Sequence, residues 1–480
     1  MANSQTKKNF PETNTKDNNE SVETIKACSA IAPIMRIAVP AIMTFFVTRM
    51  ADTLAYRFLG QLANTSYTAA AGTARVWLLM VMGSIVFGFV SAIDTLVSQS
   101  FGKRDYEMCG IHFNRGSLFS FLIALLLSPL AFYSSTFLRL MGMNEINAYY
   151  TQKYASVLVI HIILSPQVVA AQKFLRSQKI TYPQLIITIV LYALHPFWAY
   201  FFIHWLKTGF VGAAYARCCT TILSLLGLHL YIRYSKSCAK TFVLHSLKSF
   251  QGLDSYFALS YPSAVMNCLS SWGYQIVYFM SISLPTEQVA ANAVLIDINI
   301  LSSAIHSGIS SSMAVLVGNS LGAKRAKDAK VYIRTALIML AILCITCNLF
   351  LIIFKEQIAR HYSKDEKLVR IISNQIYLMT IELIFDNLQG IFGGVLLGMG
   401  RQKVAIMANL VSYYFVMIPC VYFFAHVLKY EVRGIWIGMT LGYAAVAIYY
   451  ISIVLCEDWD NLEKETIEKL EKNRLKLKSS

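Results

Sequence analysis

The stretch YFFIHWLK runs from Tyr200 to Lys207, and an almost identical stretch, YFFAHVLK, runs from Tyr422 to Lys429. Six of the eight letters agree, and the second copy follows the first by 222 positions. A repeated string of this kind indicates that a larger segment of the chain is duplicated.

Other motifs return at almost the same distance. LVSQSFG at 96–102 reappears as LVGNSLG at 316–322, and Pro40 reappears as Pro262. Because these pairs keep their order and nearly one offset, the chain is predicted to contain two copies of one unit.

The composition places both units in a membrane. Of the 480 residues, 56% are hydrophobic and only 14% are charged, and the mean hydropathy is +0.52. A soluble globular protein carries about 25% charged residues, whereas apolar runs of about 20 residues can cross a bilayer as helices. We therefore predict an all-α membrane protein with twelve transmembrane helices in two pseudo-symmetric bundles of six. The predicted spans lie near 31–56, 67–90, 115–136, 149–170, 182–206, 210–232, 256–283, 288–317, 333–354, 371–398, 404–428 and 434–456.

An even number of spans in each unit gives both units the same orientation. Parallel repeats of this type are common in transporters, whose solute site lies between the two halves. In chain order, the predicted organisation is a disordered cytoplasmic tail at 1–30, an N-lobe at 31–233, a cytoplasmic linker at 234–253, a C-lobe at 254–456 and a charged cytoplasmic tail at 457–480.

The distribution of positive charge predicts the orientation in the membrane. The net charge of +16 would suggest a nucleic-acid partner in a soluble protein, but most of the 42 Lys and Arg residues fall on the side that holds both tails. Cytoplasmic loops carry this excess, so both termini are predicted to be cytoplasmic, in the plasma membrane or a vacuolar or endosomal membrane. No nucleic-acid partner is expected. The segment from Glu457 onward can form an amphipathic helix, either on the membrane surface or, as favoured here, in solvent.

The sequence contains no motif for an enzyme or a cofactor. It lacks the GxxxxGK[ST] loop of ATP-hydrolysing proteins. Cys344 and Cys347 form a CxxC inside an apolar run, but a structural zinc site needs four ligands and no second pair is present. We expect packed free thiols, no metal and no cofactor.

Several stretches together resemble the multidrug and toxic compound extrusion (MATE) family. FGFVSAIDTLVSQSFGKRDY resembles the signature after the family's second helix, and SGISSSMAVLVGNSLGAKR its partner after the eighth. LRSQKITYPQ resembles the loop between helices 4 and 5 of the eukaryotic branch, and GGVLLGMGRQKVAIMANLVSYYFVMIP resembles the family's stretch around helices 10 to 12. The resemblance covers both lobes and implies a central cavity and cation-coupled export.

Acidic residues inside the predicted spans are the candidate ion-coupling groups, because a charge at bilayer depth is costly unless it faces a cavity or a partner. Asp297 and Asp386 match acids that the resemblance places in helices 8 and 10. Glu382 lies one turn before Asp386, and two carboxylates on one helix face resist joint ionisation. Asp52 matches an aspartate of prokaryotic members. An ion pair with Arg49, three residues earlier, is the structural alternative for Asp52.

A polar face on helix 7 is the candidate solute-binding surface. The eukaryotic branch of the family carries two glutamates at the positions of Ser270 and Gln275, so this chain departs from the pattern. The remaining polar and aromatic residues still recur at helical spacing and could bind a solute. The candidate residues are Asn267, Ser270, Ser271, Tyr274, Gln275 and Tyr278.

These features predict a monomeric secondary antiporter that exports organic, cationic or amphipathic solutes in exchange for protons, with sodium as the less favoured ion. Alternatives are a flippase for lipids or lipid-linked sugars and a receptor or scaffold that has lost transport. A flippase would need a basic cavity for a phosphate group, for which Arg49, Arg75 and Arg217 are the available residues.

Overall fold

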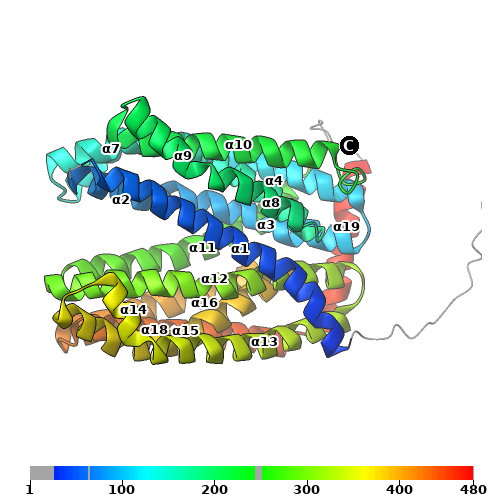
Figure 1. The fold of residues 1–480 in the computed structure, drawn as a ribbon. Coiled ribbons are helices and arrows are strands. Elements are labelled where there is room, and N and C mark those ends of the chain that lie inside the picture. The colour runs from blue at the N-terminus through cyan, green and yellow to red at the C-terminus, as the bar shows by residue number, and fades with distance from the viewer. Residues whose placement is uncertain (1–25, 63–64, 244–250, 479–480) are drawn as a thin grey trace, which may run out of the picture.

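A computed structural model describes residues 26–62, 65–243 and 251–478. These residues form helices arranged in two bundles that lie one above the other in Figure 1. Part of the predicted N-terminal tail and residues 244–250 of the predicted linker lie outside the described residues. The last residues of that tail are helical, because α1 begins at Ala27.

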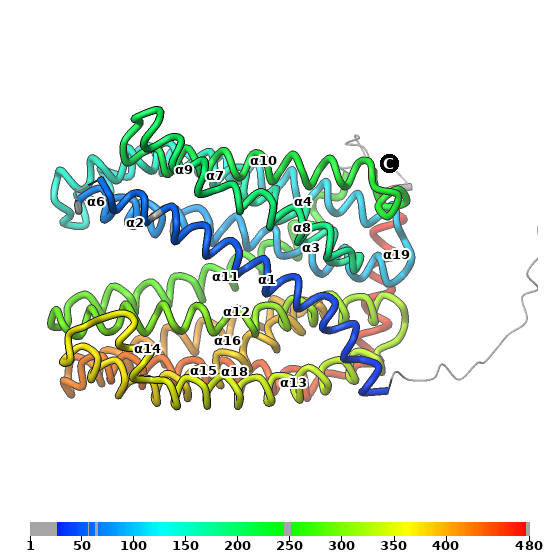
Figure 2. The backbone as a smooth tube through the Cα atoms, in the orientation of Figure 1, coloured from blue at the N-terminus to red at the C-terminus, as the bar shows by residue number. Residues whose placement is uncertain are grey.

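The first half of the chain builds the upper bundle of Figure 1 together with α1, which runs diagonally from one bundle to the other (Figure 2). Its elements are α1 (Ala27–Gly60), α2 (Thr65–Leu78), η1 (Leu79–Gly83), α3 (Ser84–Gly102), α4 (Tyr106–Leu127), α5 (Pro129–Phe132), α6 (Ser134–Leu140), α7 (Glu145–Ser177), α8 (Tyr182–Ala193), α9 (His195–Tyr200), η2 (Phe201–Trp205), η3 (Gly209–Val211) and α10 (Gly212–Tyr234).

The second half builds the lower bundle and ends in a helix that runs across the ends of both bundles (Figure 1). Its elements are α11 (Leu253–Ile282), α12 (Thr286–Gly322), α13 (Ala326–Ile353), α14 (Lys355–Tyr362), α15 (Glu366–Met399), α16 (Gln402–Asn409), η5 (Leu410–Met417), α17 (Ile418–Tyr422), η6 (Phe423–Val427), α18 (Glu431–Cys456) and α19 (Trp459–Lys478).

Within the described residues, 11 helical segments are long and apolar enough to cross a membrane. The seventh of the twelve predicted spans corresponds to α11, which is not among them. With 30 residues, α11 is about 45 Å long at 1.5 Å per residue, so its length suffices. Serine, asparagine and tyrosine residues lower its hydropathy below that of the other spans. It packs against helices of both halves, α3 and α16.

The repeated string has the same conformation in both halves. It forms a π-helical turn as η2 (Phe201–Trp205) and again as η6 (Phe423–Val427). In each turn an amide donates to the carbonyl five residues earlier at 2.9 Å. The lysine that ends each string, Lys207 or Lys429, has a positive φ of 50° or 58°. The duplication inferred from sequence is therefore confirmed in the backbone.

The two halves meet where backbones approach closely at glycines. A Cβ atom on Gly102 at the end of α3 would collide with the backbone of Asn319, and one on Gly322 at the end of α12 would collide with that of Gln99. Gly102 and Gly322 belong to the duplicated LVSQSFG and LVGNSLG motifs. Small residues let helices in a membrane pack backbone to backbone, so this motif pair fixes the α3–α12 crossing.

A second pair of glycines repeats the arrangement farther along the same helices. Gly88 on α3 faces the backbone of Ala264 on α11, and Gly308 on α12 faces the carbonyl of Ala38 on α1. The contact of α3 in the first half with α11 in the second thus corresponds to the contact of α12 in the second half with α1 in the first. The helices that carry the repeated prolines, α1 and α11, therefore both lie at the junction of the lobes.

Hydrogen bonds join the lobes at the same end. The hydroxyl of Thr95 donates to the carbonyl of Leu397 at 2.5 Å and accepts from the Gln402 amide at 2.9 Å. The amide of Gln99 donates to the carbonyl of Gly398 at 3.0 Å. These bonds pair polar groups of α3 with groups of α15 and α16 at the end where the two bundles are in contact, which we call the closed end.

The C-terminal helix α19 packs on protein rather than standing in solvent or on a membrane surface. Its apolar face, which includes Trp459, Leu462 and Leu470, is buried, and the helix contacts α3, α12 and α13. The prediction that this helix is surrounded by solvent is therefore wrong, because its apolar face is buried against protein. The sequence showed an amphipathic pattern, but the partner of the apolar face is formed only when both lobes have assembled.

Substituting Gly322 by alanine should destabilise the α3–α12 crossing. Alanine is usually favoured over glycine in a helix by roughly 0.5–1 kcal/mol, but the added methyl would meet rigid backbone and cost about 1–3 kcal/mol. The thermal midpoint of the purified protein should fall for Gly322→Ala. It should not fall for Gly72→Ala, since a Cβ atom there meets nothing within 4 Å. Equal midpoints for the two variants would contradict the close contact.

Candidate functional site

The C-lobe contains two buried acids on α15. Glu382 is 0% exposed, and its Oε2 accepts a hydrogen bond of 2.7 Å from Asn299 on α12. Its Oε1 is buried and has no hydrogen-bond partner among the described residues. Among those residues, neither Glu382 nor Asp386 pairs with a lysine or arginine.

Asp386 belongs to the same network. Its Oδ1 accepts from the Gln389 amide at 3.1 Å, and its Oδ2 lies 3.7 Å from Nδ1 of His306 on α12. That nitrogen also bonds to Oδ1 of Asn387 at 2.8 Å. Three tyrosines lie within electrostatic range of both carboxyl groups, namely Tyr274, Tyr413 and Tyr443. We call these two acids and their partners the C-lobe acid cluster.

Asp297 is separate from this cluster. Its side chain is exposed on α12, within electrostatic range of Arg49 on α1. The sequence grouped Asp297 with Glu382 and Asp386 as ion-coupling candidates, and the structure brings only the last two together. A helix with polar residues on several faces does not reveal from sequence which face is buried.

The N-lobe contains a different cluster around Asp52. The carboxylate pairs with Arg217 on α10, which donates to its Oδ1, and Oδ2 lies 3.7 Å from Arg75 on α2. The expected partner within α1, Arg49, instead stacks on the ring of Phe45 at 5.5 Å. The ion pair proposed as the structural alternative is thus replaced by pairs with two other helices.

A cavity of about 220 Å³ lies beside Asp52, and two histidines line it. Nδ1 of His161 bonds to the Thr221 hydroxyl at 2.7 Å, and Nδ1 of His195 bonds to that of Thr220 at 2.8 Å. The sequence reading missed both histidines and also His306. The sequence signal that could have identified these three histidines is their position within apolar runs.

The acid clusters of the two lobes occupy related positions in the repeat. Tyr274 follows Asp52 by 222 positions, which is the offset of Pro40 and Pro262 on the same helices. Glu382 follows His161 by 221 positions. The duplicated scaffold therefore places an aspartate and a histidine in one lobe where the other has a tyrosine and a glutamate.

The polar face predicted on α11 is divided between several partners. Asn267 donates to the carbonyl of Ser84 at 2.6 Å, and Ser270 donates to carbonyls of its own helix. Tyr274 packs against the C-lobe core. Ser271 and Gln275 are half-buried and Tyr278 is 36% exposed. The structure thus gives Asn267, Ser270 and Tyr274 packing or hydrogen-bonding partners.

Asp94 forms ion pairs that join α3 to α7. It pairs with Lys173 and lies 3.5 Å from Arg176, both on α7. Lys103, which directly follows α3, pairs with Glu471 on α19. No group of three or more His, Cys, Asp or Glu side chains that could hold a metal ion occurs in residues 26–62, 65–243 and 251–478.

Comparison with known proteins identifies the family. The MatE family model matches residues 40–201 and 262–423, two segments that are again 222 positions apart. The chain belongs to the MatE family. It is a multi-pass integral membrane protein of a multidrug and toxin extrusion transporter family, not of an enzyme family.

Individual relatives agree with this assignment. Protein DETOXIFICATION 39 of Arabidopsis thaliana is 27% identical over 447 residues, covering 93% of this chain and 88% of the relative. Multidrug and toxin extrusion protein 1 of Oryctolagus cuniculus is 27% identical over 427 residues, covering 89% and 75%. The crystal structure of the eukaryotic MATE transporter AtDTX14 superposes with a TM-score of 0.87 at 25% identity, covering 92% of this chain and 99% of that one.

Neutralising Asp52 should destabilise the N-lobe. Asp52→Asn would remove the carboxylate that pairs with Arg217 and Arg75, whose side chains are 22% and 41% exposed. The cost should therefore lie below the about 3–5 kcal/mol of breaking a fully buried pair. The thermal midpoint should fall clearly for Asp52→Asn. It should change little for the matched control Asp297→Asn, whose side chain is exposed.

A second substitution tests the cause of this loss. Met439 follows Arg217 by 222 positions, so Arg217→Met replaces the cation with the residue that the C-lobe uses. Adding Arg217→Met to Asp52→Asn should recover part of the lost stability. If the double variant is less stable than Asp52→Asn alone, the arginine that has lost its carboxylate is not the cause.

Proposed function

We propose that this MatE transporter exports organic solutes, amphipathic or cationic in character, in exchange for protons. The observation that carries the proposal is the burial of Glu382 without a cationic partner among the described residues. An ionised carboxylate is costly at bilayer depth unless it is paired. A proton is the smallest cation that can neutralise this carboxylate, whose Oε1 is enclosed by protein.

In this proposal the C-lobe acid cluster is the proton site. Glu382 and Asp386 lie one turn apart and exchange protons as a coupled pair, and His306 and Asn299 on α12 hold them in place. Since α12 also crosses α3 and α1, a change in the cluster can reach the junction of the lobes. Proton and solute need only favour different arrangements of the two lobes for exchange to follow.

The relatives' names support export of foreign compounds, since they include multidrug and toxin extrusion and detoxification. Tyr274 and Tyr278 on α11 are our candidates for aromatic contacts with the solute, and Ser271 and Gln275 for its hydrogen bonds. The flippase alternative is less well supported, because Arg217 and Arg75 are engaged by Asp52 and so are less available to a phosphate group.

Flux measurements in proteoliposomes test the proposal. An imposed pH gradient should drive solute uptake, and Asp386→Asn and Glu382→Gln should each reduce that flux at least about tenfold, because an amide cannot exchange a proton. The control Glu356→Gln alters an exposed glutamate on α14 and should leave the flux unchanged. Uptake driven by a sodium gradient alone would mean that the coupling ion is sodium and not the proton. Absence of flux under both gradients would favour a transport-inactive protein.

We also propose that both termini are cytoplasmic, so that α19 lies at the cytoplasmic end. Lys464 on α19 and Lys364 between α14 and α15 are both exposed. With the exposed Cys28 and Cys456 replaced by serine, an impermeant maleimide added outside intact cells should label Lys364→Cys but not Lys464→Cys. The reverse pattern would invert the orientation.

A further inference from the structure

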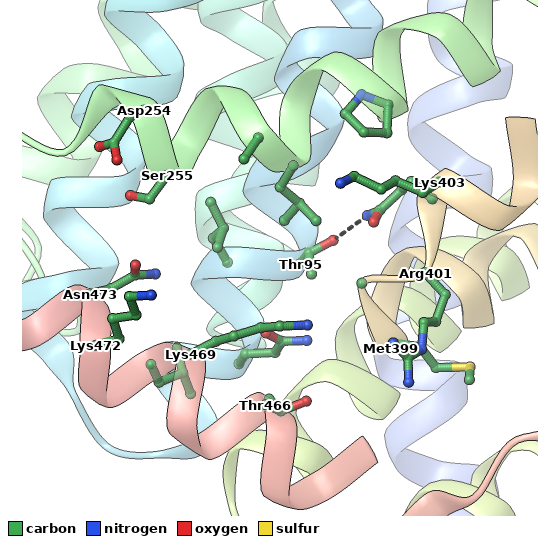
Figure 3. A pocket seen from close by; sticks show the side chains of 18 of the residues that line it. Thr95, Asp254, Ser255, Met399, Arg401, Lys403, Thr466, Lys469, Lys472 and Asn473 are labelled. Atoms are coloured by element: carbon green, nitrogen blue, oxygen red, sulfur yellow. Dashed lines mark hydrogen bonds between the residues drawn. The ribbon is translucent and has the colours of Figure 1, made fainter. Parts of the chain in front are cut away.

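A second cavity lies at the α19 end of the molecule, away from both acid clusters. Its volume is about 560 Å³, within the range of about 300–1,000 Å³ typical of small-molecule sites. Figure 3 shows Thr95 of α3 at its centre, Asp254 and Ser255 of α11 at one end, and Arg401 and Lys403 near the start of α16 at the other. Side chains of α19 close it from below in that view.

Ion pairs hold α19 against both halves of the chain. On the C-lobe side, Arg401 lies 2.5 Å from Glu457 and 3.1 Å from Glu465. On the N-lobe side, Lys103 at the end of α3 lies 3.2 Å from Glu471. The cavity is therefore walled by elements from both lobes, and α19 connects them.

The lining is strongly cationic. It contains the side chains of Arg401, Lys403, Lys469, Lys472 and Lys476 and a single carboxylate, Asp254. That carboxylate is engaged by the Lys476 ammonium at 2.6 Å, which also holds the pKa of Asp254 below its usual value. Of the glutamates of α19, Glu465 pairs with Arg401 and Glu471 pairs with Lys103.

Two lysines reach the cavity from opposite sides. In Figure 3, Lys403 extends inward from α16 and Lys469 extends inward from α19. Lys403 and Lys472 form no ion pair with the described residues. Lys469 forms a long pair with Glu465 at 3.8 Å, and 69% of the Lys469 side chain is exposed. Thr95, Gln99 and Asn473 add neutral polar groups between these charges.

We propose that this cavity binds a phosphate-bearing anion that holds the two lobes together at the α19 end. Phosphate groups accept several charge-assisted hydrogen bonds, and lysines bind them well. A ligand with more than one phosphate matches cations that approach from two sides better than a single carboxylate does. Because α3 of the first half lines the cavity together with α11 and α16 of the second half, separating the lobes dismantles the site, so the ligand stabilises the closed arrangement.

Two probes distinguish a soluble source of the phosphates from a lipid headgroup. The first is inositol trisphosphate, titrated into the purified full chain by calorimetry. The second is incorporation into nanodiscs that contain phosphatidylinositol bisphosphate, compared with phosphatidylcholine alone, with the thermal midpoint as readout. Neither measurement requires transport, so its outcome is independent of the proposed antiport.

The variant Lys403→Gln/Lys469→Gln removes both converging charges, and Lys327→Gln/Lys464→Gln removes two exposed lysines outside the cavity. The first should weaken binding of the active probe by about tenfold or more, equivalent to about 1.4 kcal/mol, while the control stays close to wild type. Binding of the soluble probe assigns a soluble ligand, and a response to the lipid alone assigns a headgroup. No response to either probe, or equal losses in both variants, would overturn the proposal.

The link to the lobe contact has its own readout. Ser98 on α3 is buried against Gly318 on α12, so a maleimide reacts with Ser98→Cys only when this contact opens. In a background with Cys28 and Cys456 replaced by serine, the active probe should slow that reaction. It should have no such effect when Lys403→Gln/Lys469→Gln is also present. An unchanged rate with bound probe would show that the site does not hold the lobes together.

Discussion

The backbones of α3 and α12 touch at Gly102 and Gly322, and the positions of both lobes depend on that contact. Inside a bilayer, apolar side chains gain little by leaving lipid, so helices associate mainly through close packing and hydrogen bonds. The glycines supply the close packing, and Thr95 and Gln99 supply hydrogen bonds at the same end. The junction helices α1 and α11 then pack on the outer sides of this crossing, and α19 covers its end. Any relative motion of the lobes must therefore either open this contact or pivot about it.

The duplicated scaffold carries two different solutions for charge at bilayer depth. In the N-lobe, Asp52 is compensated by arginines from two neighbouring helices, which makes the cluster a structural ion-pair network beside a small cavity. In the C-lobe, Glu382 has only an asparagine as hydrogen-bond partner among the described residues. Repetition of the fold thus gives equivalent positions, while substitution at those positions separates a charge-compensated lobe from one whose buried glutamate has no cationic partner among the described residues. Our proposal that ion coupling lies in the C-lobe rests on this asymmetry.

The candidate site could be predicted only in part. Asp52, Glu382 and Asp386 stood out because acids within apolar runs are rare, and the structure places all three in buried or partly buried polar clusters. Asp297 stood out for the same reason but is exposed and apart from the others. His306 and Asn299 were missed because their roles depend on α15 lying beside α12. The basic cavity was also missed, since its lysines are far apart in the chain and resemble ordinary charges of a loop and a tail.

The sequence by itself determined the class and the architecture of this protein. Long apolar runs leave helices as the form that satisfies every backbone group in lipid. Nearly equal offsets between the paired prolines, glycines and aromatic strings indicate two similar halves. Only the tertiary structure decided which charges meet. Asp52 has Arg49 on its own helix yet pairs with Arg217, 165 positions away, and α19 buries its apolar face on a surface that both lobes form together. Periodicity along a chain reports the face of a helix, but the partner of that face is set by packing between segments whose separation in sequence carries no information about their distance in space.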